Sequence, residues 1–273
     1  MNITQKNHIE KIVDEEITRF AVKFEKRYQK EVGDAQGVIN RKRNNRFITE
    51  LGDEFIFYSA FVRSFDSAFG KVLEAMGNRI AAFSFTVRKK VDSFLLPQQS
   101  QHIDYMILQY EDHVPPRAED YNGFTCMTPR DITSYKKSHV TDHYFYHPKK
   151  KEHYLIELKS GGDLDNKKAK TEKLALLQEY FILKNSLPLD SKDTVKIFLG
   201  TAYNLYGEGQ PWNQERVKQF FAQDELLIGK AYWNFICDSP DGYDIVFQQY
   251  QKSAAAIKSA LVRIKGLYFP EEA

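Results

Sequence analysis

The chain lacks the features that mark secreted and membrane proteins. Two of its 273 residues are cysteine, Cys126 and Cys237, and they lie far apart rather than in a C-x-x-C pair. The sequence has no amino-terminal signal segment and no run of about 18 apolar residues. We therefore expect free thiols, a cytoplasmic protein without a membrane-spanning segment, and a core that forms without disulfide bonds.

Several catalytic signatures are also missing. The chain has no G-x-S-x-G motif and no G-x-x-x-x-G-K-[ST] loop, which argues against a serine hydrolase and a P-loop enzyme. His143, His147 and His153 invite a zinc site, but on one strand His143 and His147 would lie about 13 Å apart, too far to share an ion. We interpret these histidines as strand and turn residues.

Positive charge is concentrated in two segments, although the net charge is only +2. Residues 40–47 read NRKRNNRF and hold no acid, and residues 167–173 read KKAKTEK, with four lysines and one glutamate. Such segments are often solvated surfaces. They are also typical of proteins that bind a polyanion such as nucleic acid.

The pattern of apolar residues predicts a mixed α/β fold with a helical amino-terminal region. Ile9, Val13, Phe20, Phe24 and Tyr28 recur at multiples of three and four, which predicts a helix over the first thirty residues. The remaining expected elements are helices at 48–65, 66–85 and 165–185, two or three helices between 213 and 264, a loop at 111–137, and strands at 102–110, 139–147, 153–159 and 194–203. We interpret residues 1–273 as a single domain, with a helical region at 1–100 and a core at 101–273.

The strands at 139–147 and 153–159 are expected to form a hairpin around the segment PKKKE. With Lys149 and Lys150 at its centre, Asp142 lies seven residues before the first lysine and Glu157 seven residues after the second. In that register the two carboxylates face each other, with Cβ atoms about 4.5–5.5 Å apart. Like charges so close are destabilising without a cation between them, and Mg²⁺ favours carboxylate ligands.

Lys159 lies one pleat beyond Glu157 on the same face of its strand, because side chains two positions apart share a face. There its amine could hold or deprotonate a water molecule. The strand ends at SGGD, residues 160–163, and glycines permit another backbone, such as a DNA strand, to approach. A Glu-x-Lys pair is also common on ordinary solvated strands, and a one-residue change of register would put Asp142 on the other face.

Asp142 followed by IELK, with Glu157 and Lys159, resembles the PD-(D/E)xK signature of metal-dependent nucleases, although Thr141 stands where that signature has proline. The segment SAFGKVLEAMG, which contains Glu74, resembles the helix that carries an additional active-site glutamate in many restriction enzymes of that fold. Residues 153–187, TAYNLYGEGQPWNQERVKQFF and LLIGKAYWNFI resemble type II restriction endonucleases of the TdeIII/MjaII kind, which cut GGNCC-type sites. The similarity covers the last half of the chain well and the first half loosely.

This resemblance implies a single nuclease domain with a restriction-endonuclease-like core, a mixed β-sheet flanked by helices. It implies that Asp142, Glu157 and the backbone carbonyl of Leu158 bind Mg²⁺, that Lys159 positions the attacking water, and that Glu74 is an outer carboxylate. The metal would lower the pKa of its water and stabilise charge on the phosphate, leaving 5′-phosphate and 3′-hydroxyl ends. Taken by itself, Glu74 is better explained as an ordinary surface charge of its helix.

Under the same interpretation, the basic segments contact double-stranded DNA. Lysine reads guanine in the major groove, so the start of the helix at 165–185 and the junction near residue 213 are candidates for base reading, and 40–47 for phosphate contacts. An ordinary cationic helix face would show the same lysines. The candidate DNA-binding residues are Asn166, Lys167, Lys168, Lys170, Asn213, Gln214, Arg216, Arg41 and Arg43.

A palindromic site predicts a homodimer, whose contacts we expect in the region 1–100 together with contacts to the DNA backbone. A restriction enzyme also implies a prokaryotic cell and a cognate DNA methyltransferase as a functional rather than a physical partner. Two alternatives share the pattern: a repair or junction-resolving nuclease with little sequence specificity, and a non-catalytic DNA-binding protein on this fold. The intact set of Asp142, Glu157 and Lys159 argues against the second alternative.

Overall fold

The computed structural model describes residues 1–270, and the chain divides into two compact units. The first unit comprises Met1–Arg79 and Asp244–Ala273, and the second comprises Ile80–Tyr243. No helix among the described residues combines the length and the apolar character that crossing a bilayer requires. Within the described part of the chain, both cysteines are free, and Cys237 is buried.

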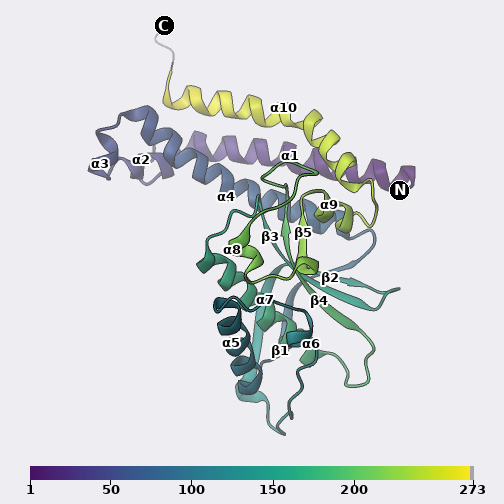
Figure 1. Cartoon of the computed structure of the whole chain (residues 1–273). Coiled ribbons are helices and arrows are strands. Elements are labelled where there is room, and N and C mark those ends of the chain that lie inside the picture. Colours follow the sequence, from purple (N-terminus) through teal and green to yellow (C-terminus); the bar gives the residue numbers. More distant parts are fainter. Residues whose placement is uncertain (271–273) are drawn as a thin grey trace. The chain divides into compact units, whose positions relative to one another are not determined.

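The first unit is helical. Its elements are α1 (Ile3–Glu31), α2 (Val38–Lys42), α3 (Arg46–Thr49), α4 (Asp53–Ala81, of which the last two residues fall in the second unit) and most of α10 (Gly242–Tyr268). The three long helices α1, α4 and α10 run alongside one another (Figure 1). Aromatic rings join them: Phe24 meets Phe61 edge-on at 5.7 Å between centroids, and Phe57 lies 5.3 Å from Tyr268. The amphipathic pattern of the first thirty residues therefore buries its apolar side against other helices.

Ion pairs tie the same helices together at their surfaces. Arg79, near the end of α4, contacts Glu15 and Glu16 of α1, each at 2.6 Å. Arg263 of α10 bonds both carboxylate oxygens of Glu25 at 2.7 Å. The helices expected separately at 48–65 and 66–85 are one continuous α4, so this expectation was wrong. No proline interrupts that segment, and its apolar residues keep one helical phase across the predicted break.

The second unit contains a five-stranded mixed sheet, in the order β1-β2-β3-β4-β5. Its strands are β1 (Thr86–Phe94), β2 (Lys136–His147), β3 (Glu152–Lys159), β4 (Thr194–Thr201) and β5 (Leu226–Ile228). The pairs β1–β2 and β2–β3 are antiparallel, whereas β3–β4 and β4–β5 are parallel. The other elements are α5 (Pro97–Glu111), α6 (Glu119–Asn122), η1 (Thr133–Tyr135), α7 (Asn166–Ser186), α8 (Glu215–Lys218), η2 (Gln223–Glu225) and α9 (Lys230–Ile236). The predicted mixed α/β fold is confirmed.

The two faces of the sheet pack against different helices. On one face Leu155 and Leu199 belong to the same buried cluster as Leu177 of α7. On the other face Tyr154 meets Phe235 of α9 edge-on, with ring centroids 4.9 Å apart. Because side chains alternate along a strand, residues 157 and 159 share the face of Leu155 and lie on the side covered by α7.

The prediction of a strand at 102–110 was wrong, because this segment is part of α5. Ile103, Met106, Ile107 and Tyr110 are all buried and follow the three- and four-residue spacing of a helix, which begins at Pro97. Strands β1 and β5 were not predicted, and the expected loop at 111–137 contains α6 and η1. β1 is an edge strand whose sequence, TVRKKVDSF, is mostly polar, so it lacks a continuous apolar pattern.

Candidate active site

The hairpin of β2 and β3 brings Asp142 and Glu157 to neighbouring positions. His143 opposite Ile156 is the last pair of the antiparallel ladder, and the same register places Asp142 opposite Glu157 one step further. Oδ2 of Asp142 accepts a hydrogen bond from the backbone N–H of Leu158 at 3.0 Å. The carboxylate of Asp142 is therefore fixed against β3 at the point where the backbone ladder ends.

Lys159 connects the sheet to α7. Its Nζ donates to Oε1 of Glu157 at 2.6 Å and lies 2.7 Å from Oε1 of Glu172 on α7. Burial lowers the pKa of Lys159, but the two carboxylates outweigh burial and the net shift is upward. The two carboxylates therefore favour the charged form of the amine.

Two glutamates of α7 belong to the cluster and were missed from the sequence. Glu172 and Glu179 are seven residues apart, about two helical turns, and so share one side of α7. Glu179 is 7% exposed and forms no hydrogen bond or ion pair with another described residue. Burial, followed by the charges of Glu157, Asp142 and Glu172, raises its pKa to about 8. The sequence signal that could have identified them is the seven-residue spacing of Glu172 and Glu179, on either side of Leu176, which puts both glutamates on one side of a helix.

The cluster holds more negative charge than Lys159 balances. Burial and then the charge of Asp142 raise the pKa of Glu157 to about 7, with a smaller contribution from Glu172. Four carboxyl groups thus interact around one ammonium group, and the raised pKa values of Glu157 and Glu179 indicate that the cluster lacks positive charge. A cation bound among these carboxylates would remove that repulsion.

The donor set fits a divalent cation that prefers oxygen ligands. Carboxylates, with waters completing the shell, are the ligands that Mg²⁺ takes in phosphoryl-transfer sites. No three of the described His, Cys, Asp and Glu side chains converge closely enough to hold a metal ion as they stand. Asp142 and Glu157 meet the requirement for oxygen donors at adjacent strand positions, while Lys159 is bonded to one oxygen of Glu157.

The two glycines after β3 have a local structural reason. Gly162 has φ +73°, and a Cβ there would lie 2.7 Å from Cγ2 of Thr201. A Cβ on Gly161 would collide with the ring of Tyr203. The close approach that the sequence suggested for a DNA strand is therefore made by the protein's own side chains.

The candidate DNA-binding residues of the second unit lie on α7, on α8 and in the loop before α8. Asn166 and Arg216 line one cavity of about 450 Å³. Asn166 also lines a second cavity of about 450 Å³ with Lys167 and Lys170. His113 and Gln219 line both cavities, so the two are adjacent. The structure thus brings the start of α7 beside α8, although 48 or more residues separate them in the sequence.

Other candidates near these cavities have specific partners. Lys170 forms an ion pair with Glu111 at 2.7 Å. Lys168 is exposed, 3.9 Å from Asp165, the residue that caps α7 by accepting the N–H of Lys168. The carbonyl of Asn213 and the amide of Gln214 both bond the hydroxyl of Tyr206, at 2.9 and 3.2 Å. Lys168 therefore has only a long contact with its own capping residue, whereas Lys170 is directly paired.

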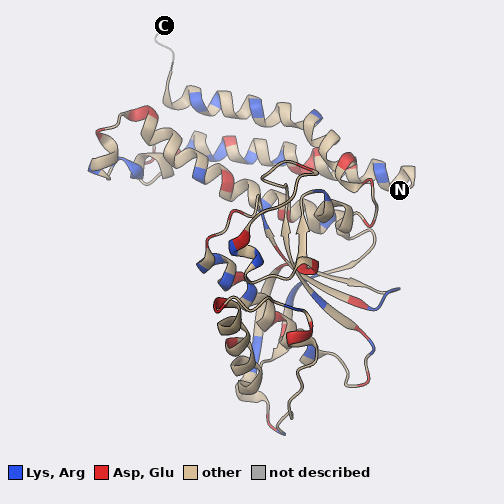
Figure 2. Ribbon diagram, viewed as in Figure 1, with Lys and Arg blue, Asp and Glu red and all other residues tan. Residues whose placement is uncertain are grey.

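Three candidates lie in the first unit. Arg41 lines a cavity beside α2, whereas Arg43 pairs with Asp53 at 3.1 Å. Glu74 is partly buried on α4. Basic residues occur on α2 in this unit and on α8 in the other (Figure 2). The outer-carboxylate role of Glu74 stays a prediction.

The strand histidines bond groups within the second unit. Nε2 of His143 lies 2.7 Å from the hydroxyl of Tyr232, and burial lowers the pKa of His143 to about 3. His153 bonds the hydroxyl of Tyr144 through Nδ1 at 3.0 Å. Nε2 of His153 lies 3.3 Å from Oδ2 of Asp193, so both rings are bonded to side chains inside the unit.

Comparison with known families identifies the class of enzyme. Residues 5–254 match the model of the family described as HinfI, type II restriction endonuclease. No curated protein and no solved structure matches the chain. The expectation of a type II restriction endonuclease is confirmed at the level of the enzyme class. Because the match spans nearly the whole chain, the protein belongs to the HinfI family of type II restriction endonucleases and is a site-specific deoxyribonuclease.

Proposed function

We propose that the protein cuts double-stranded DNA by Mg²⁺-dependent hydrolysis at the cluster formed by Asp142, Glu157 and Lys159. The observation that carries this proposal is the position of Asp142. Its carboxylate is bonded to the backbone of β3 at Leu158, directly beside Glu157, with the ammonium group of Lys159 2.6 Å from Glu157. Two acids and an amine on one face of a hairpin are the components that metal-assisted phosphodiester hydrolysis requires.

Each residue has a distinct role in this proposal. Asp142, Glu157 and the backbone carbonyl of Leu158 would hold Mg²⁺. When bound, the metal activates water and stabilises the charge that develops on the phosphate. The ammonium group of Lys159 orients the attacking water and stabilises negative charge near it, and Glu172 fixes that ammonium group from α7. Glu179 supplies a further buried carboxyl group beside these residues.

For specificity, we infer a GGNCC-type palindrome, supported by the resemblance of residues 153–187 to enzymes of the TdeIII/MjaII kind. The start of α7 and α8, with Asn213 and Gln214 directly before α8, would supply the base-reading side chains, since residues of α7 and α8 line adjacent cavities. A palindrome requires two-fold symmetry, so the active form would be a homodimer. The enzyme would act in the prokaryotic cytoplasm, and a cognate methyltransferase would protect the host DNA.

Incubation of the purified protein with unmodified phage DNA tests the proposal. With Mg²⁺ we expect discrete fragments, and sequencing of their ends gives the recognition site, the cut position and the 5′-phosphate. EDTA and Glu157→Ala should each prevent cutting. A smear would instead support a nuclease of low specificity, and Mg²⁺-dependent binding without cutting would support a non-catalytic protein. A sizing measurement on the enzyme with its DNA tests the dimer.

A further inference from the structure

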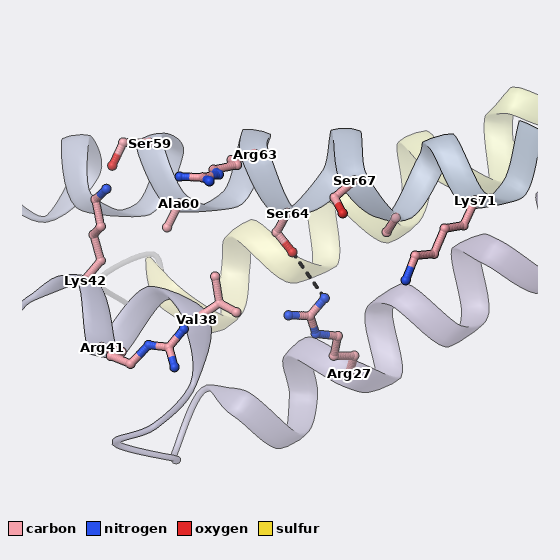
Figure 3. Close-up of a pocket in the computed structure, with 11 residues that line it drawn as sticks. Arg27, Val38, Arg41, Lys42, Ser59, Ala60, Arg63, Ser64, Ser67 and Lys71 are labelled. Carbon is pink, nitrogen blue, oxygen red and sulfur yellow. Dashed lines mark hydrogen bonds between the residues drawn. The ribbon is translucent and has the colours of Figure 1, made fainter. Parts of the chain in front are cut away.

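The first unit contains a cavity of about 610 Å³ among α1, α2 and α4, separate from the residues assigned to catalysis. Its lining residues are Arg27, Val38, Arg41, Lys42, Ser59, Ala60, Arg63, Ser64, Ser67, Ala68 and Lys71. In Figure 3, Arg27 and Lys42 point from α1 and α2 toward α4, and Lys71 points back from α4 toward α1. Basic side chains from three helices therefore face the same cavity.

The charge of this cavity is entirely positive. It is lined by five basic side chains, three serines, two alanines and a valine, with no acid. Arg27 is held in place by Glu31 at 2.5 Å and by the hydroxyl of Ser64 at 3.2 Å. The other four basic residues, Arg41, Lys42, Arg63 and Lys71, form no ion pair with any of residues 1–270. Cations gathered without acidic partners repel one another, and an anion bound between them would remove that cost.

The shape of the cavity favours an extended anion. Ser59, Arg63, Ser67 and Lys71 are spaced four residues apart, so they form one row along α4. Twelve residues of helix rise about 18 Å, and over that length one strand of B-DNA carries about five phosphates. A single phosphate ion would reach only part of the row. Cationic groups and hydroxyls are the ligands of the sugar–phosphate backbone and carry no information about the bases.

We propose that this groove, lined by Arg27, Arg41, Lys42, Arg63 and Lys71, binds the sugar–phosphate backbone of duplex DNA. The inference rests on the proposed function, because it names a second contact with the same substrate. It assigns Arg41 a place in a built groove together with four further cations, and it leaves out Arg43, which is paired with Asp53. The groove supplies affinity that is independent of sequence and sensitive to salt.

The test is the binding of the full-length enzyme to a fluorescent duplex in EDTA, measured across a range of salt concentrations. Arg63→Gln/Lys71→Gln removes two cations of the row, and both side chains are exposed, so the helix is retained. Each lost phosphate contact lowers the steepness of log K against log salt by about 0.9. We expect the slope to fall by about 2 and affinity to weaken on the order of 10- to 100-fold at about 0.1 M salt.

The matched control is Lys252→Gln/Lys258→Gln, which removes two exposed cations of α10 outside the groove. A second groove variant, Arg41→Gln/Lys42→Gln, should behave like the first. Wild-type affinity and slope in both groove variants would overturn the proposal, and so would an equal loss in the control. Cutting with Mg²⁺, measured in parallel, separates the two hypotheses. An enzyme that cuts but shows no groove effect contradicts only the groove, and one that shows the groove effect but never cuts contradicts only the nuclease function.

Discussion

Lys173 of α7 donates to both carboxylate oxygens of Glu225 at 2.6 Å, in a place where the lysine is fully buried and the glutamate is 2% exposed. The hydroxyl of Tyr121 donates to the same carboxylate at 2.7 Å, and so does the backbone N–H of Ala222 at 2.8 Å. The pair thus fastens α7, which carries Asn166 and the candidate lysines, to η2, the short helix that follows α8.

Lys173→Met should destabilise the second unit by about 3–5 kcal/mol, because it leaves the carboxylate of Glu225 buried without its cation. Lys173→Met/Glu225→Gln should recover part of that loss, since both charges are then absent. Urea unfolding followed by circular dichroism measures the difference in unfolding free energy. A loss below about 1 kcal/mol in the single variant would show that the pair contributes little to stability.

Glu157→Ala and Lys159→Ala should abolish cutting while DNA binding survives. Loss of a group that acts on the reacting water costs on the order of 100-fold or more in rate, whereas neither residue is among the proposed base-reading groups. Single-turnover cleavage with Mg²⁺ and binding in EDTA separate the two effects. Lys196→Ala is the control, because Lys196 lies on the adjacent strand and pairs with Glu152 at 2.6 Å. Cutting at the wild-type rate in either active-site variant would refute the site.

The hairpin could be predicted because its information is local. Alternation in β2 and β3 and the turn around Lys149–Lys150 determine the register that places Asp142 beside Glu157. The roles of Glu172 and Lys173 could not be predicted in this way. They are adjacent in sequence, yet one contacts Lys159 at the sheet and the other is fully buried against Glu225. Both contacts depend on how α7 packs against the sheet and its neighbours, and the apolar pattern of α7 alone does not determine that packing.

The fold beyond the hairpin was predicted where long helices show a clear apolar stripe, as in α1. The errors occurred where tertiary contacts replace a strong local pattern. β1 is polar because it is an edge strand, and it is held by pairing with β2. The segment of α5 around Met106 contains enough β-prone residues to resemble a strand, and the buried side of the helix decides its structure.

The metal-free enzyme should lose stability as the pH rises from about 5 to 8.5. Glu157 and Glu179 have pKa values of about 7 and 8 in the folded protein, against 4.5 for an unperturbed glutamate. The folded state therefore binds more protons than the unfolded state in this range, so the stabilising contribution of the protonated groups is complete below about pH 4.5 and is lost above their folded pKa values. Thermal melting in EDTA across this pH range measures the slope.

Glu179→Gln tests the origin of that slope, because glutamine keeps the shape of the side chain and cannot ionise. It should flatten the pH dependence and raise the melting temperature at pH 8.5. Asp104→Asn, at an exposed position of α5, makes the same change in charge and should leave the slope unaltered. If Glu179→Gln melts with the wild-type slope, the buried carboxyl of α7 does not carry the repulsion assigned to it.

Lys168→Ala should weaken or relax the choice of cutting site more than it slows catalysis. Lys168 is exposed at the start of α7 and lies 3.9 Å from Asp165, whereas the neighbouring Lys170 is already bonded to Glu111. A lysine bonded to guanine contributes about 1–3 kcal/mol of discrimination, so its loss should raise cutting at sites with one changed base by roughly 5- to 150-fold relative to the preferred site. Sequencing the ends of fragments from a library of randomised sites measures this ratio.

Lys184→Ala, at the exposed far end of the same helix, is the control and should keep the wild-type preference. Unchanged affinity and unchanged preference in Lys168→Ala would remove this residue from the base-reading surface and leave that role to the side chains around Asn166 and Arg216.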